Sequence, residues 1–132
     1  MPVRFEYDAE QKLLLITFSG ALLDADLVRV YQQSRDFAAE HVIARGILDG
    51  LRLTSFNVSS ELVRSIAHQP PMLPEDSDRC IVVSQDYLYG MARMYQLMGG
   101  ESRDRLRVVR TLDEAYQYLG IAPPTNLQAI EE

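Results

Sequence analysis

Short apolar segments with the pattern of strands alternate along this chain with segments of helical period. Residues 3–8 alternate between apolar and polar side chains, and 13–19 follow after a short polar connection, so the two predict a β-hairpin. Helical stretches then separate three further apolar segments, at 44–49, 79–84 and 105–110. A hairpin followed by alternating helices and strands favours one mixed, mostly parallel sheet.

Four helices are expected between and after these strands. The first begins at Asp24, and the second runs from about Ser59 to His68. The third follows Asp86, which we expect to be its N-cap, and the fourth ends at Gly120 after a Thr-x-x-Glu capping box that starts at Thr111. The expected fold is therefore α/β, with one five-stranded sheet and four helices in the order β-β-α-β-α-β-α-β-α.

The length and charge of the chain limit what it can bind. The 132 residues fit one domain, which we expect over 1–122, followed by a loose tail over 123–132 with at most one turn of helix. A net charge of −6 argues against a nucleic-acid partner, because a phosphate backbone demands a basic surface. No segment approaches the ~20 apolar residues of a membrane span or forms a signal peptide, so a cytoplasmic location is expected.

The segment "SFNVSSEL" and the order of elements resemble the STAS domain, the SpoIIAA-like fold of bacterial anti-sigma-factor antagonists. In that family an Asp closes a strand, a Phe follows, and an Asp-Ser-Ser-Gly-Leu turn opens the second helix. The matching positions here are Asp49, Phe56, Ser59, Ser60 and Leu62. The pattern departs at Val58, where the family has Asp, and at Glu61, where it has Gly. The segments "YGMARMYQ" and "VVRTLDEAY" are similar to an uncharacterised bacterial branch described as STAS- or Sec14-like.

The resemblance implies a role for Ser59. The first serine of the family's pair is phosphorylated by a partner kinase, which makes Ser59 the candidate phosphoacceptor. The alternative is that Ser59 only caps the second helix, which serine does well without any chemistry. If it is only a cap, an aspartate at position 59 should be tolerated, because aspartate also caps helices. Loss of the family's Asp and the presence of Glu61 favour the cap.

The third helix carries a stripe of methionine and tyrosine that predicts a contact surface. Its members lie one or two turns apart and are Tyr87, Met91, Met94, Tyr95 and Met98. Packing against the sheet explains such a stripe, but Leu88, Ala92 and Leu97 make the helix apolar almost all round. We therefore expect a homodimer or a bound apolar molecule to cover this region.

The remaining reactive side chains predict no metal site or catalytic centre. His41 and His68 stand far apart without metal-ligand spacing, and Cys80 is expected to be a small buried hydrophobe. An arginine run at 103–110 is expected on the exposed face of an edge strand.

The pattern favours a non-catalytic, STAS-like binding or regulatory module that acts on a protein partner of unknown identity and needs no cofactor. The alternative is a Sec14-like carrier or sensor of a small apolar, lipid-like ligand.

Overall fold

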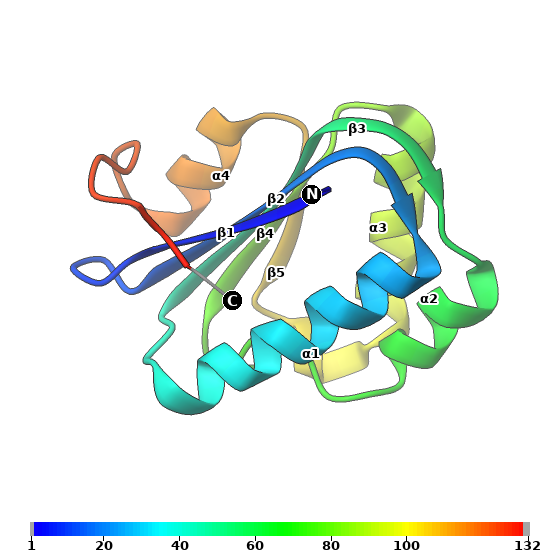
Figure 1. The fold of residues 1–132 in the computed structure, drawn as a ribbon, viewed down its shortest axis with the longest axis horizontal. Helices are drawn as coiled ribbons and strands as arrows, with labels where there is room; N and C mark the ends of the chain where they lie inside the picture. Colours follow the sequence, from blue (N-terminus) through cyan, green and yellow to red (C-terminus); the bar gives the residue numbers. More distant parts are fainter. Residues whose placement is uncertain (1, 131–132) are drawn as a thin grey trace.

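The expected hairpin opens the structure, a computed structural model that describes residues 2–130. Strand β1 (Val3–Asp8) pairs antiparallel with β2 (Leu13–Leu23), and β2 continues in parallel with β3 (Arg45–Asn57). Strands β4 (Asp78–Val82) and β5 (Leu106–Val109) extend the parallel part on the far side of β3. Alternating strands and helices therefore form one mixed sheet, as the sequence predicts (Figure 1).

The expectation of five strands is wrong by one, because the described residues form a sixth. Strand β6 (Gln128–Ala129) lies in the segment for which we expected a loose chain or a helical turn, and it pairs antiparallel with β1. The strand order is β5-β4-β3-β2-β1-β6. Two exposed residues give no periodic signal, which is why the sequence does not reveal this strand. The last two residues of the expected tail lie outside the described residues.

Strands β2 and β3 also run further than expected, to residues 23 and 57 rather than 19 and 49. Their added lengths pair with each other, from Ser19 opposite Arg52 to Leu23 opposite Asn57, with one shift of register before Ser19 and another between Gly20 and Ala21. The sequence suggested a stop at Asp49 and Gly50, but Gly50 lies within the strand. A Cβ at Gly50 would come within 2.9 Å of Val83 Cγ1, so glycine permits close packing there.

The four α-helices of the described chain lie on both faces of the sheet. Helices α1 (Asp24–Glu40), α2 (Ser60–Ala67) and α3 (Asp86–Met98) cover one face, and α4 (Leu112–Leu119) covers the other (Figure 1). Neighbouring residues of β3 face opposite layers: Ile47 packs with α4, whereas Leu48 packs on the side of the other three helices. No helix of residues 2–130 has the length and apolar character needed to cross a membrane.

The helix ends largely follow the local signals in the sequence. Thr111 caps α4 by accepting a hydrogen bond from the Glu114 backbone N–H at 3.1 Å, and Gly120 ends that helix in the left-handed conformation. The expected cap of α3 is displaced by one residue. Gln85 occupies the N-cap position and Asp86 is the first helical residue.

Candidate functional site

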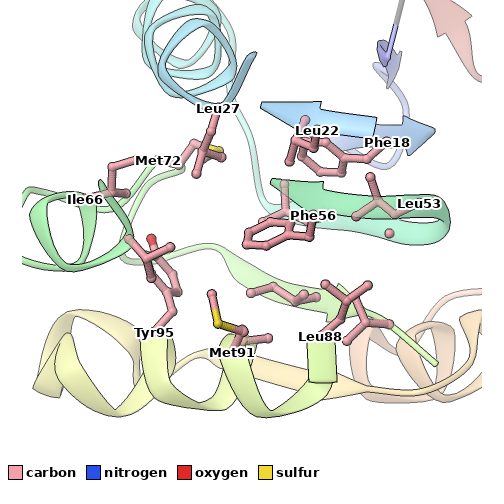
Figure 2. Close-up of a pocket in the computed structure, with 16 residues that line it drawn as sticks. Phe18, Leu22, Leu27, Leu53, Phe56, Ile66, Met72, Leu88, Met91 and Tyr95 are labelled. Carbon is pink, nitrogen blue, oxygen red and sulfur yellow. The ribbon is translucent and has the colours of Figure 1, made fainter. Parts of the chain in front are cut away.

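A cavity of about 130 Å³ lies between the sheet and the three helices that cover one of its faces (Figure 2). Its wall combines residues from β2, β3, β4 and the segment just after it, all three helices, and the segment after α2. The lining residues are Phe18, Leu22, Leu27, Leu48, Gly50, Leu53, Phe56, Val63, Ile66, Met72, Ile81, Val83, Leu88, Met91, Ala92 and Tyr95. The cavity is thus bordered by the main apolar core and is partly open to solvent.

The spacing of the helices explains why this space is not filled. Helix α1 packs on β2, whereas α3 packs on β5 and on α2. The middle of the sheet therefore receives less cover, and Leu48 of β3 and Ile81 of β4 remain only partly buried. The added lengths of β2 and β3 carry Leu22 and Phe56 to the wall, and Figure 2 shows Phe56 opposite Met91 of α3.

The chemistry of the wall is almost wholly apolar. Among the lining side chains, one hydroxyl is present, on Tyr95, which extends from α3 toward Ile66 of α2 (Figure 2). The lining residues thus include no carboxylate, imidazole, thiol or amine that could take part in acid–base or nucleophilic chemistry.

Arg103 packs against the face of the Tyr95 ring. The Arg103 guanidinium carbon lies 4.1 Å from the centre of that ring, and the guanidinium donates to the backbone carbonyls of Ala67 at 3.0 Å and Ile66 at 3.4 Å. Gly99 leaves room for this arrangement, because a Cβ there would lie only 1.6 Å from Arg103 Nη1. The expectation that Arg103 shares the exposed face of an edge strand is therefore wrong. Its side chain is buried and caps the carboxyl end of α2 through hydrogen bonds to two backbone carbonyls.

The structure divides the predicted methionine and tyrosine stripe of α3. Met91 and Tyr95 line the cavity, whereas Met94 packs against the same core without lining it. Met98 is half-buried, and Tyr87 points outward with 63% of its surface exposed. Sequence reasoning missed the lining residues of β2 and β3. For β3 the available signal was the aromatic and aliphatic content of "LRLTSF", which follows the end expected for that strand at Asp49 and Gly50.

Ser59 forms the cap that the sequence predicts for α2. Its Oγ accepts a hydrogen bond from the Leu62 N–H at 3.2 Å. The same hydroxyl donates to Asp24 Oδ2 at 3.0 Å, and the Ser59 backbone N–H donates to Asp24 Oδ1 at 2.7 Å. Asp24 therefore joins the beginning of α1 to the beginning of α2. Phosphorylation of Ser59 stays a prediction.

The other reactive side chains lie apart from the cavity. Cys80 is fully buried between the sheet and α4, and burial raises its thiol pKa to about 12, so it behaves as the small hydrophobe that was expected. His41 stacks on Phe37 at a centroid distance of 3.9 Å, and His68 ends α2. Within residues 2–130, no group of three histidine, cysteine or acidic side chains could hold a metal ion.

The exposed arginines near the edge strand have partners within the chain. Arg105 pairs with Asp78 at 3.0 Å and Arg110 with Asp86 at 2.9 Å. Arg107, on the exposed face of the edge strand β5 as expected, lies over the Tyr118 ring. These contacts spread the positive charge rather than concentrate it in one basic patch.

Comparison with known proteins identified no relative of this chain. No protein-family model matches the chain, and no curated protein matches it significantly.

Proposed function

We propose that this protein is a non-catalytic binding module that takes up a small apolar molecule in the cavity between its sheet and helices α1–α3. The observation that carries the proposal is a partly open apolar space of about 130 Å³ against the main core. An engineered protein cavity of about 150 Å³ with a similar aliphatic and aromatic wall stays dry and binds benzene. The space therefore suits a molecule of about that size. It is too short for a whole fatty-acyl chain, which favours a sensor or carrier of small molecules over a lipid carrier.

The energetic cost of an empty cavity supports the same proposal. Protein interiors are close-packed, and an unfilled cavity costs about 24 cal/mol for each Å³. Because the space is partly open to solvent, its cost is smaller than that of a closed cavity of the same volume, but its apolar wall still lacks packing partners. A bound apolar molecule would recover part of this energy through contacts with the wall.

The binding proposal is tested by filling the cavity from within. Ala92 lines the cavity from α3, so Ala92→Leu places three additional carbons in the open space. We expect this variant to unfold with about 1 kcal/mol more free energy than the wild type and to lose the binding of toluene. Urea denaturation measures the first effect, and a calorimetric titration measures the second.

Ala39→Leu is the matched control, because Ala39 is exposed on α1 and does not line the cavity. We expect it to change stability by less than about 0.5 kcal/mol and to leave toluene binding intact. Binding of toluene that is equally strong in Ala92→Leu and in the control would contradict the proposal.

A second candidate function is a STAS-like module that binds a protein partner. The observation that favours it is the position of Ser59 and Ser60, both exposed at the beginning of α2 within the chain order typical of the SpoIIAA-like fold. Against a phosphorylated state stands Asp24, whose carboxylate already contacts the Ser59 hydroxyl and would repel a phosphate. Mass spectrometry of protein from its own host tests this candidate: phosphoserine at position 59 would support it, and unmodified Ser59 would contradict the switch.

A further inference from the structure

We propose that the Tyr95 hydroxyl selects, among small apolar molecules, those that carry one oxygen acceptor, such as a phenol or a small aldehyde. The inference rests on the proposed binding function and adds the chemical class of the ligand. Among the lining side chains, that of Tyr95 carries a hydroxyl group. The others present only carbon and sulfur atoms to a ligand.

The Tyr95 hydroxyl is available for such a contact. Within residues 2–130, the tyrosine hydroxyls that donate to protein groups are those of Tyr7, to the Val42 carbonyl, and Tyr31, to the Pro70 carbonyl. The hydrogen bonds among the described residues include none from the hydroxyl of Tyr95, which is half-buried. A phenolic O–H both donates and accepts, so an oxygen atom of a bound molecule would complete its hydrogen bonding.

Neighbouring residues fix the direction in which this hydroxyl points. Arg103 packs against the Tyr95 ring, and two backbone carbonyls of α2 hold Arg103 in turn. Little side-chain entropy is then lost when a ligand binds, because the tyrosine is already positioned. The Arg103 guanidinium carbon lies 4.1 Å from the ring centre, and Arg79 also interacts electrostatically with Tyr95, so a cationic ligand is disfavoured next to this residue.

The size of the cavity limits the remainder of the ligand. About 130 Å³ accommodates a benzene ring, so a ring with one oxygen substituent fits when that substituent lies toward Tyr95 and α2. Toluene and phenol have the same shape and differ in one methyl or hydroxyl group. The pair therefore separates the apolar contribution of the cavity from the polar contribution of Tyr95.

The test measures the dissociation constants of toluene and phenol for the wild-type protein, for Tyr95→Phe and for Tyr87→Phe. Phenylalanine keeps the ring over Arg103 and removes only the hydroxyl. We expect Tyr95→Phe to weaken phenol about two- to tenfold, the range of a typical net hydrogen bond, and to change toluene by less than about twofold. Tyr87 is exposed on the same helix and outside the cavity, so Tyr87→Phe should affect neither ligand.

The possible outcomes distinguish the two proposals. If toluene binds and Tyr95→Phe leaves phenol unchanged, or weakens both ligands equally, the role of Tyr95 is overturned while the binding function stands. If the wild type binds neither ligand, the binding function fails as well. Should Tyr95→Phe not fold, nuclear Overhauser contacts in the wild type decide: contacts between the ortho protons of phenol and the Tyr95 ring support the proposal, and contacts of the para proton alone overturn it.

Discussion

Ser59 combines a local and a distant interaction in one side chain. It caps α2 through the Leu62 N–H and also binds the carboxylate of Asp24, 35 residues earlier in the chain. The cap was predictable, because a serine before a helical apolar pattern is a local signal. The bond to Asp24 was not, because it depends on how the ends of β2 and β3 bring the two helices together.

Substitution of Ser59 should therefore cost more than substitution of its neighbour. We expect Ser59→Ala to lower the free energy of unfolding by about 1 to 2 kcal/mol, since it removes both the cap and the hydroxyl bound to Asp24. Ser60→Ala, the matched control at the first helical position, should change it by less than about 0.5 kcal/mol. Urea denaturation compares the two, and equal losses would show that Ser59 has no special role.

Asp24 also changes what is expected of an aspartate at position 59. From the sequence alone that aspartate should be tolerated as a cap. In the structure its carboxylate would lie next to that of Asp24, and two like charges so close repel each other. The structure therefore predicts that Ser59→Asp is less stable than the wild type, whereas the sequence alone predicts that it is tolerated.

At the scale of elements, the added lengths of β2 and β3 contribute Leu22, Leu53 and Phe56 to the wall of the cavity. They were missed because glycines at positions 20 and 50 interrupt the strand pattern, and a glycine in such a pattern usually indicates an end. Gly20 has a φ of +70° and lies where the register between β2 and β3 shifts. Gly20 therefore lies at an irregularity of the pairing within a strand rather than at the end of the strand.

The same substitution at two glycines should have opposite effects. Gly20→Ala places a side chain in the left-handed region and should cost about 1 kcal/mol, although a Cβ there would meet no other atom within 4 Å. Gly90→Ala, within α3 and equally free of contacts, should stabilise the protein by about 0.5 to 1 kcal/mol through helix propensity. Thermal unfolding of both variants is the measurement, and a stabilised Gly20→Ala would contradict a strained backbone at this position.

The order of elements was predictable because each strand and helix carries its own periodic signal. Strand β6 shows the limit of prediction from periodicity. Its two residues carry no periodic pattern, and they form a strand because they pair with the edge of β1. Such an element depends on the completed sheet rather than on its own residues.

At the scale of the whole molecule, the cavity results from the separation of α1 and α3 across the middle of the sheet. Sequence periodicity shows which face of each helix is apolar, but not how far apart two helices lie. The apolar stripe of α3 therefore pointed to Met91 and Tyr95, and it also included Tyr87, which faces outward. The opposite wall, with Phe18 and Phe56, required the three-dimensional arrangement.

A crystal of the wild-type protein held under xenon pressure tests most directly whether the cavity accepts an apolar molecule. Xenon enters dry apolar cavities of this size without needing any polar contact. We expect xenon density between Leu53 and Phe56 on one side and Met91 on the other, inside the volume of about 130 Å³. A core in which side chains fill that volume, with no xenon bound there, would contradict the proposed binding function.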